Sequence, residues 1–582
     1  MDKNFILSGV AAEWVDHLLY EGNRKEDFFY LNQSAARIVS TIAFPIFAAL
    51  DVPIQIYKIC RAYTKVLSAK NELTALKARV EVARHKDLLE RCFLGVLCSP
   101  AGLICSDIVT QHFVMKYKES GKVTPYGKLY SEEVEEVTPR SIEEIQEVIH
   151  RARENGKKVS IAGAQMSQGK QILPPNKGDI VLNMENFNKV QIDSDKKIAK
   201  VGSGATWADI QRQANEYGLG IRVMQASNVF SVGGSISANC HGWDHRSGTL
   251  SNTVKSLTII DAEGNIRKLT PEDELFGLVA GGYGGFGVIL SAEISLADNL
   301  LLETQSAIVD TSDYVNYFKN KILTDDKITM HLYRLSLDPN NLFGEAIATN
   351  YVKIGSERVI TPLADEPERG WRLDRIKLHC IRRFKSLISL AWKLEKKAMQ
   401  VKEVQSRNEI MRPIINPVFN NSKVDTEWLQ EYFVKGEDLD DFLKFLAKTL
   451  KDNDVPLYNA SVRYVTKDNL SKLGYANKGD RFAIVLFFNQ PLNPEKINKT
   501  EKWVKKVIDY LNERDGSYYL PYMHFATKEQ FQKAYPQWRY VAVKKDQYDP
   551  DHLFVNGLYK DYVLPNVREK LGKDQQAEDL TA

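Results

Sequence analysis

Apolar residues form two short uncharged runs near the start of the chain, at 38–50 and 92–106. A helix that crosses a membrane needs about 20 consecutive apolar residues, so neither run is long enough for a simple span. Between them, at 66–83, apolar residues recur at helical spacing among many charged ones, which predicts an amphipathic helix. The pattern fits two structures for residues 1–115: a helical accessory domain that buries both runs, or a helical region that enters a membrane surface.

From residue 133 the pattern changes to one of mixed helices and strands. Ser141 and Glu144 form a capping box in front of an amphipathic helix, and Thr206 caps a second helix. Strand patterns lie next to these helices, and Glu263-Gly264-Asn265 marks the turn of a hairpin. The strands are expected at 158–162, 180–184, 198–201 and, as the hairpin, at 254–268.

Residues 301–515 show the pattern of a second unit, built on a half-buried sheet. Within it, residues 372–402 are rich in Lys and Arg and interleaved with Ile, Leu and Trp. This predicts a basic amphipathic helix or helix pair, although the same pattern fits a solvated face on a long insertion. Residues 516–570 return to an aromatic-rich, ordered pattern, and the polar tail 571–582 is expected to be disordered. The strands of the second unit are expected at 346–352, 460–465 and 482–488.

The composition is that of a globular protein and argues against several classes. The 582 residues are 43% apolar and 26% charged, and the formal net charge is only +3, so no nucleic-acid partner is expected. The six cysteines have neither the spacing of a zinc site nor the density of a secreted disulfide scaffold. We therefore expect a reducing, cytoplasmic location and no metal centre. The first residues lack the pattern of a signal peptide.

Three glycine-rich stretches, at 163–169, 232–242 and 281–287, provide the clearest indication of function. A glycine lets the backbone approach another group closely because it has no Cβ, and three such stretches in one domain indicate a large cofactor. A Rossmann fold places its glycines between a strand and a following helix. Here the first stretch leads toward Pro174-Pro175 and the last follows a helix pattern, so a plain NAD-binding domain is disfavoured.

The order of these stretches resembles the PCMH-type FAD-binding domain of the vanillyl-alcohol-oxidase superfamily, over residues 125–300. Residues 125–565 are most similar to the branch that contains aldonolactone oxidases and decaprenylphosphoryl ribose oxidase. The resemblance implies an α+β fold, in which a two-subdomain FAD-binding domain precedes an antiparallel-sheet substrate (cap) domain at 301–515. The hydrophobic helical region 1–115 lies outside the resemblance, and 516–570 would complete the active site. The C-terminal signature of the branch is present as Tyr519-Leu520-Pro521-Tyr522, Tyr535-Pro536 and Asp549-Pro550, with Phe554 and Asn556.

The resemblance also implies where FAD binds. Backbone N–H groups of the first stretch can form an anion-binding concavity for the pyrophosphate, and the small residues of the second would let the chain lie against the flavin. Many relatives attach FAD covalently through a His in the first stretch, but that position is Met166 here, so FAD is expected to be non-covalent. The implied cofactor-binding residues are Gly163, Ala164, Gln165, Met166, Ser167, Gly233, Gly234, Ser235, Ala238, Gly242, Gly287, Val288 and Ile289.

At the expected catalytic positions the chain departs from these relatives. Aldonolactone oxidases carry a Glu-x-Arg pair, of which Ser461-Val462-Arg463 keeps only the Arg, and Tyr522 stands where both groups of relatives have an active-site Lys. Removing hydride from a carbinol carbon requires a base for the hydroxyl proton and a cation for the developing negative charge. His241 and Tyr522 are our candidates for the proton, and Arg463 is our candidate for the charge.

Two functions are consistent with these observations. The first is an FAD-dependent oxidoreductase that oxidises a carbinol carbon of a sugar, aldonolactone or sugar-lipid and passes the electrons to an acceptor that the sequence does not identify. The second is a catalytically degenerate flavin-fold protein that acts as a membrane-associated binding module, which the losses at Ser461 and Tyr522 favour. Either would allow peripheral or re-entrant contact with the cytoplasmic side of a membrane, through the apolar runs and the basic stretch 372–402.

Overall fold

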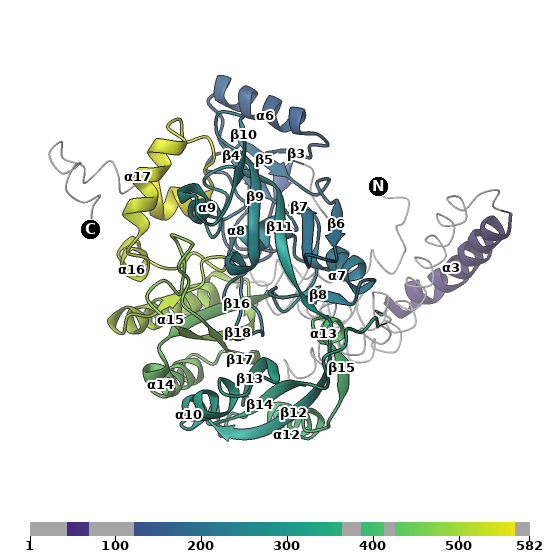
Figure 1. The fold of residues 1–582 in the computed structure, drawn as a ribbon, viewed down its shortest axis with the longest axis vertical. Helices are drawn as coiled ribbons and strands as arrows, with labels where there is room; N and C mark the ends of the chain where they lie inside the picture. The colour runs from purple at the N-terminus through teal and green to yellow at the C-terminus, as the bar shows by residue number, and fades with distance from the viewer. Residues whose placement is uncertain (1–43, 69–120, 362, 364–385, 413–424, 565–582) are drawn as a thin grey trace.

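The computed structural model describes residues 44–68, 121–361, 363, 386–412 and 425–564 (Figure 1). Helix α3 (Phe44–Leu67) contains the second half of the first apolar run and continues through Pro53. A proline inside a helix removes one backbone hydrogen bond but does not end this helix. Within the described residues, none of the helices is both long and apolar enough to cross a membrane. The run at 92–106 and the tail 571–582 lie outside the described residues, as does nearly all of the predicted helix 66–83.

The first unit contains a small parallel sheet, in the order β3-β5-β4. Helix α6 (Ile142–Glu154) connects β3 to β4, and the Ser141 hydroxyl accepts a hydrogen bond from the Glu144 N–H, as the capping box predicts. The apolar face of α6 packs in one core cluster with strands β4 and β5. The strands are β3 (Glu135–Val137), β4 (Val159–Ala162) and β5 (Ile180–Asn183), and a separate ribbon pairs β1 (Lys122–Val123) with β2 (Glu132–Glu133).

An antiparallel sheet lies beside it, in the order β10-β9-β11-β7-β6, with β8 paired to the far end of β11. The predicted hairpin is confirmed, because β9 and β10 pair antiparallel around the turn at Gly264. Helix α7 (Trp207–Asn215) begins with the predicted Thr206 capping box. The strands are β6 (Val190–Asp193), β7 (Ile198–Gly202), β8 (Leu219–Ile221), β9 (Val254–Ile260), β10 (Ile266–Leu269) and β11 (Val288–Asp298), and η4 (Leu250–Thr253) and α9 (Glu274–Val279) lie in the connections.

The glycine-rich stretch 232–242 is partly helical, and the sequence does not predict a helix there. Its first residues form the short helix α8 (Val232–Ser237), so Gly233 and Gly234 lie in the first helical turn. A helix this rich in glycine is unfavourable by itself, and it persists here because Val232 and Ile236 are fully buried in the main core. The small residues of this stretch therefore let a helix, rather than an extended loop, approach its neighbours.

The second unit is an eight-stranded antiparallel sheet, in the order β15-β12-β14-β13-β17-β18-β16-β19. The three strands predicted there are confirmed as parts of β14, β17 and β18. The strands are β12 (Leu301–Asp310), β13 (Ile328–Leu335), β14 (Glu345–Lys353), β15 (Val404–Ser406), β16 (Asp425–Val434), β17 (Leu457–Val465), β18 (Arg481–Pro491) and β19 (Ser517–Tyr518), and the short helices α10 (Tyr314–Tyr317), η5 (Phe318–Ile322), α13 (Arg407–Ile410) and η7 (Gly436–Asp438) connect them.

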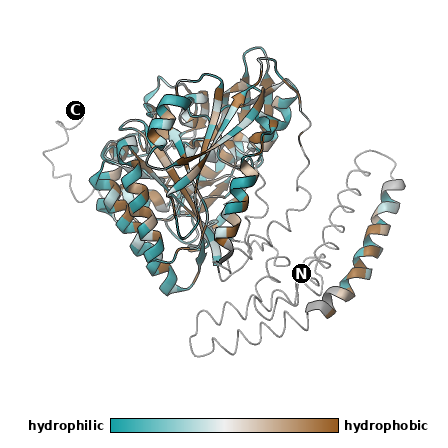
Figure 2. Ribbon diagram, turned by 90° about the horizontal axis from the view of Figure 1, so that it is seen from below, coloured by the Kyte–Doolittle hydropathy of each residue, from teal (hydrophilic) through white to brown (hydrophobic). Residues whose placement is uncertain are grey.

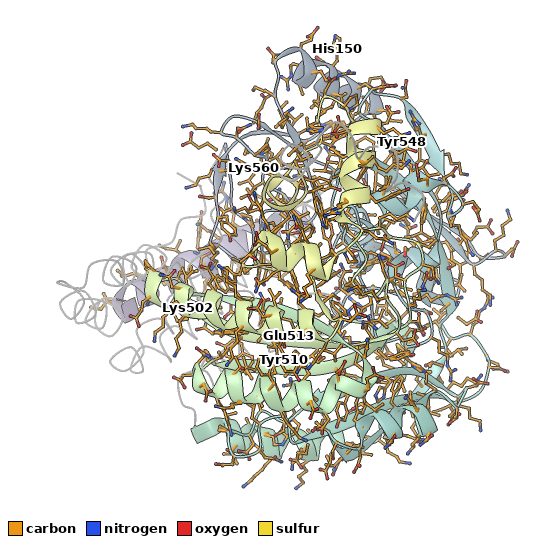
Figure 3. All side chains as sticks on the ribbon, turned by 90° about the vertical axis from the view of Figure 1, so that its left-hand side faces the viewer. His150, Lys502, Tyr510, Glu513, Tyr548 and Lys560 are labelled. Atoms are coloured by element: carbon orange, nitrogen blue, oxygen red, sulfur yellow. The ribbon has the colours of Figure 1, made fainter. Side chains whose placement is uncertain are left out.

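The two faces of this sheet have different neighbours. Successive side chains of a strand point to opposite faces. The Tyr432 ring packs on Phe442 of α14 (Leu439–Asp452), and the Phe488 ring packs on Trp503 of α15 (Pro494–Glu513). The even-numbered residues of β16 and β18 thus face these helices, which lie on the outside of the molecule (Figures 1 and 3). The odd-numbered residues of these two strands face the opposite way, toward the glycine-rich stretches.

The described part of the basic stretch is helix α12 (Ser386–Met399), which docks on the second sheet. The Trp392 side chain is buried, and its indole N–H donates to the Glu345 carboxylate, 3.0 Å away. Lys396 forms an ion pair with the same carboxylate. One face of the helix is therefore packed, while Leu390 and Leu394 on another face are 53% and 60% exposed. Figure 2 shows this mixture of apolar and polar positions on the outer helices.

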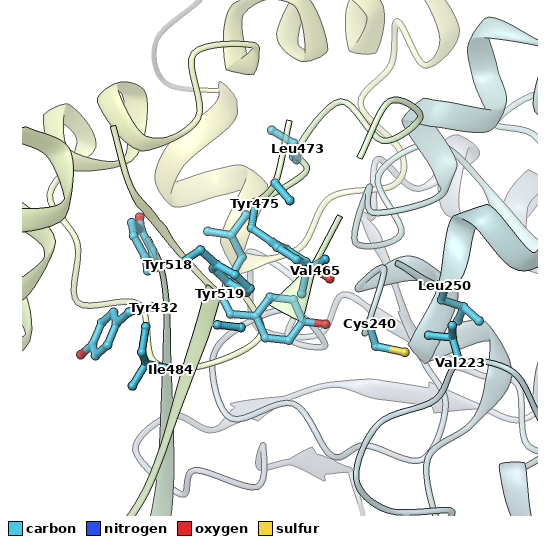
Figure 4. Close-up of a cluster of buried hydrophobic side chains, with 14 of the residues drawn as sticks. Val223, Cys240, Leu250, Tyr432, Val465, Leu473, Tyr475, Ile484, Tyr518 and Tyr519 are labelled. Carbon is cyan, nitrogen blue, oxygen red and sulfur yellow. The ribbon is translucent and has the colours of Figure 1, made fainter. Parts of the chain in front are cut away.

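The C-terminal segment returns to the first unit. Helices α16 (Lys528–Ala534) and α17 (Trp538–Tyr548) lead to a bridge between Phe554 and Val159 of β4, and η8 (Tyr559–Val563) follows. Tyr519 and Tyr475 reach toward Cys240 in the main hydrophobic core (Figure 4). This core contains residues of the first unit, the second unit and the C-terminal segment, and so joins these three parts of the chain.

Candidate active site

A cavity of about 450 Å³ lies between the first unit and the inner face of the eight-stranded sheet. This volume is within the range of pockets that hold cofactors and small ligands. All three glycine-rich stretches contribute to its lining, although they are far apart in the sequence. Among the predicted cofactor-binding residues, the cavity is lined by Gly163, Ala164, Gln165, Met166, Ser167, Gly233, Gly234, Ser235, Ala238, Gly287 and Ile289.

Gly242 and Val288 lie behind this lining. The Val288 side chain is fully buried in the core cluster that also contains residues of α6, β4 and β5. A Cβ at Gly242 would come within 2.8 Å of the Met224 carbonyl oxygen, so this glycine allows two backbone segments to touch. The structure therefore places these two residues in the support of the cavity, and a contact of either one with the cofactor stays a prediction.

The glycines of the first two stretches are required by close contacts with the protein itself. A Cβ at Gly163 would lie 2.1 Å from the Ser231 hydroxyl, and a Cβ at Gly233 would lie 2.7 Å from the Cβ of Ser203. Gly234 is different, because a Cβ there would meet only the Ser231 hydroxyl, at 3.0 Å. A larger side chain at Gly234 would occupy cavity space. The absence of a Cβ at this position therefore leaves room for a bound cofactor close to the backbone.

The loop after β4 has the properties of an anion-binding site. Gln165 has a positive φ of 56°, so the backbone turns sharply there. The Ala164 N–H donates to the Ser231 hydroxyl, 3.1 Å away. In the described part of the chain, the next three backbone N–H groups, of Gln165, Met166 and Ser167, donate to no protein acceptor. Consecutive free N–H groups on a cavity wall fit a pyrophosphate.

The opposite wall is the inner face of the eight-stranded sheet. In the register of the strands, Glu431 of β16 and Ser461 of β17 both pair with Val485 of β18. These three side chains therefore lie in one row across the sheet. Arg463 lies two residues further along β17 on the same face. The wall is formed by Leu332, Arg334, Leu429, Glu431, Asn459, Ser461, Arg463, Val485 and Phe487.

Glu431 connects two of the residues that the sequence predicted for proton transfer. One carboxylate oxygen lies 2.5 Å from His241 Nε2, and both side chains are only 3% exposed. The Tyr522 hydroxyl donates to the other oxygen at 3.3 Å. Burial, reinforced by the Glu431 carboxylate, raises the pKa of Tyr522 well above its usual range. Tyr522 is therefore a neutral donor near pH 7.

The His241 ring is held among aromatic side chains. The rings of Phe433, Tyr475 and Tyr519 lie 5.8 to 6.4 Å from it, at steep angles. Its second nitrogen, Nδ1, is buried and has no hydrogen-bond partner among the described residues. His241 thus makes one strong polar contact, to Glu431, and lies otherwise in an apolar setting.

Two arginines line the cavity, and their surroundings differ. The Arg334 guanidinium is paired with Glu395 of α12 at 2.8 Å and donates to the Tyr458 carbonyl oxygen. Arg463 forms no ion pair with any described residue, and its Nε is buried without a hydrogen-bond partner. Arg463 as a whole is partly buried, and a buried N–H normally has a hydrogen-bond partner, so this Nε and the positive charge are available to a ligand.

Sequence reasoning missed Glu431. The strand that carries it was not predicted, because β16 is buried on both faces and does not alternate between polar and apolar positions. The one local signal is a set of three acids, Asp425, Glu427 and Glu431, in a segment that also contains several aromatic and aliphatic residues. The position of Glu431 in the same row as Ser461 follows from the strand order β17-β18-β16, which brings together residues that are 30 positions apart.

Comparison with known families identifies the class of the first unit. Residues 136–270 match the family described as FAD binding domain, a match that starts in β3 and ends just after β10. This segment includes the anion-binding loop and α8. The resemblance to the PCMH-type FAD-binding domain of the vanillyl-alcohol-oxidase superfamily is therefore confirmed, and FAD is the cofactor.

Several curated relatives are oxidases of sugars, lactones or alditols. The decaprenylphosphoryl-beta-D-ribose oxidase of Mycolicibacterium smegmatis is 32% identical over 157 residues, which are 26% of this chain and 34% of that protein. The L-gulonolactone oxidase of Bos taurus is 27% identical over 28% of this chain and 38% of its own length, and the alditol oxidase of a Streptomyces species is 24% identical over 27% and 37%. Each match therefore spans little more than a third of the relative.

Proposed function

We propose that this protein is an FAD-dependent oxidoreductase that oxidises a carbinol carbon of a sugar, aldonolactone or sugar-lipid. The observation that carries the proposal is the pairing of two walls across one cavity. A wall of glycine-rich backbone, in the stretch that also carries His241, faces a sheet wall that carries Glu431 and Arg463. Glu431 is hydrogen-bonded to His241 and to the Tyr522 hydroxyl, and Arg463 has no ion-pair partner among the described residues. FAD supplies an acceptor for a hydride, and the second wall supplies the polar groups that an alcohol needs when it loses one.

Each of these groups has a task in that reaction. The hydroxyl proton of the substrate must go to a base as the carbon–hydrogen bond breaks. The substrate oxygen develops negative charge during the same step, and a fixed cation in a water-poor cavity stabilises that charge strongly. Arg463 has the free charge for this task, while His241 and Tyr522 belong to the hydrogen-bonded group that receives or directs the proton.

The relatives and the lining of the cavity support the substrate class. The names of three relatives describe a lactone, an alditol and a lipid-linked ribose as their substrates. Leu332, Leu429 and Phe487 make part of the sheet wall apolar, which suits a substrate with an apolar portion beside its hydroxyl groups. The absence of a carboxylate at Ser461 favoured a degenerate, non-catalytic protein, and Glu431 in the same row weakens that argument.

Anaerobic reduction of the bound flavin tests the proposal. Purified holoprotein is mixed without oxygen with xylitol, L-gulono-1,4-lactone, D-arabinono-1,4-lactone and a short-chain polyprenylphosphoryl ribose, and the visible flavin absorbance is followed. We expect at least one of these compounds to bleach it. If none does, while dithionite reduces the same flavin, the proposed activity is wrong and the binding-module function is favoured. Re-oxidation by oxygen or by a quinone then identifies the acceptor.

We further propose that FAD is bound without a covalent link. Met166 lies on the cavity wall in the stretch where many relatives have the attachment His, and a thioether sulfur does not form that bond. The buried Cys240 thiol also lines the cavity, and burial raises its pKa far above the usual range, so it stays protonated and unreactive. Acid precipitation should release the yellow colour into the supernatant. Colour that remains with the pellet would contradict a non-covalent cofactor.

A further inference from the structure

Ser461 carries no carboxylate, but Glu431 on another strand provides one in the same row of the sheet. Ser461 and Glu431 flank Val485 in one row of the sheet, so their Cα atoms are about 10 Å apart, two strand spacings of about 4.8 Å each. Both side chains point into the same cavity. A carboxylate in this wall therefore reaches the substrate from β16 instead of from β17.

We propose that Glu431 is the catalytic base of this enzyme, with His241 as the residue that positions it. This inference rests on the proposed function. Glu431 accepts one hydrogen bond at each oxygen, from His241 and from Tyr522, and a carboxylate has about four acceptor sites. Capacity for a substrate hydroxyl thus remains on the side that lines the cavity.

The other two candidates for the proton are less suitable than Glu431. Tyr522 keeps its own proton, because burial and the neighbouring carboxylate both raise its pKa. The Nε2 of His241 is occupied by Glu431, and its Nδ1 is enclosed with the rings of Phe433, Tyr475 and Tyr519. An imidazole held in this way can fix the carboxylate in place through its Nε2–H.

The proposed step balances. The substrate O–H bond breaks and a new O–H bond forms on a Glu431 oxygen. The hydrogen on the same carbon would leave with its electron pair, for which bound FAD would supply the acceptor, so that the carbinol would be oxidised to a carbonyl. The positive charge of Arg463, on the same wall, stabilises the oxygen while the proton leaves it.

The test compares Glu431→Gln with a matched change on the same strand. Glu427→Gln alters a buried glutamate that lies four residues earlier and does not line the cavity. Each holoprotein is reduced anaerobically with whichever of the four compounds reduces the unmodified protein fastest, and its FAD content is measured. We expect Glu431→Gln to keep FAD and to slow reduction by about 10²- to 10⁴-fold, the usual contribution of a general base, while Glu427→Gln stays within threefold.

A second variant separates a chemical role from a structural one. Glu431→Ala leaves a space in the cavity wall that a small carboxylate can enter, so sodium formate should raise its reduction rate at least tenfold, whereas sodium chloride should not. Failure of formate to raise the rate overturns the assignment. So does a Glu431→Gln protein that is reduced at the unmodified rate or that purifies without FAD. If no compound reduces the unmodified protein, the proposed function and this inference fail together.

Discussion

Arg463 shows how the surroundings of one residue, rather than its type, indicate its task. Arg334 lies on the same wall, on strand β13, which pairs directly with the strand β17 that carries Arg463. The charge of Arg334, however, is compensated by Glu395. Arg463 is partly buried and has no such carboxylate among the described residues, and its buried Nε has no hydrogen-bond partner there. An uncompensated cation on a cavity wall is suited to interact with a substrate oxygen.

Replacing Arg463 by alanine should therefore retain FAD and slow its reduction by substrate. Loss of one donor that stabilises an oxyanion commonly costs about 10²- to 10³-fold in rate. Rapid-mixing measurements of flavin bleaching under anaerobic conditions check this, with Arg212→Ala as a control because the Arg212 side chain is 72% exposed. An unchanged rate in Arg463→Ala would show that this charge does not act on the substrate.

Gly234 provides a residue-scale test of the cofactor wall. A valine there would project into the cavity, since its Cβ meets only the Ser231 hydroxyl and the rest of the side chain has no other space. We expect Gly234→Val to fold and to purify without FAD, as measured by the absorbance ratio at visible and ultraviolet wavelengths. The control is Ala398→Val, which adds the same branched side chain at an exposed position of α12, away from the cavity. Full FAD content in Gly234→Val would place the flavin elsewhere.

At the scale of elements, the sequence predicted those helices and turns whose structure depends on residues close to them in the chain. The capped helices α6 and α7 and the β9–β10 hairpin could be predicted because caps and turns act over a few residues. The glycine stretches indicated the cofactor for the same reason. Strand β16 and its Glu431 could not be predicted, because their position depends on pairing with β18, about 55 residues later in the chain.

The C-terminal segment contains one fully buried ion pair that holds two elements together. Lys545 of α17 lies 2.5 Å from Asp549 and also donates to the carbonyl oxygens of Gly285 and Phe554. Burial lowers the pKa of Lys545, and although burial alone would raise the pKa of Asp549, the charge of Lys545 keeps it low. The lysine thus ties the third glycine stretch to the segment that bridges to β4.

Lys545→Met should destabilise the protein strongly. It leaves the Asp549 carboxylate buried without its cation, a loss of about 3–5 kcal/mol in the free energy of unfolding. Urea unfolding of the holoprotein, followed by flavin fluorescence, measures this. The control Lys448→Met removes an ion pair whose lysine is 77% exposed, and it should change the stability by less than about 1 kcal/mol. Equal stabilities of the two variants would mean that the buried pair contributes little.

At the scale of the whole molecule, the residues outside the FAD resemblance bear on where the protein acts. Helix α3 exposes Ile46, Leu50, Ile54 and Tyr57, which are 57%, 52%, 43% and 66% exposed. Their spacing places them on one face of the helix, and the buried Asp51 and Gln55 lie off that face. Such an apolar stripe suits the interface of a lipid bilayer better than water.

We therefore expect the protein to bind a membrane surface through α3, assisted by the basic stretch. Each well-placed Lys or Arg near an anionic surface adds about 1 kcal/mol. In a flotation gradient at low salt, the full-length chain should rise with phosphatidylserine-containing vesicles. A chain that begins at Lys122, and the variant with Leu50→Asp and Ile54→Asp, should stay at the bottom. The variant Ile266→Asp, which changes an apolar side chain that is 53% exposed on β10, should still float. If the full-length chain stays at the bottom, the apolar face of α3 has another partner, and a lipid-linked substrate loses its strongest support.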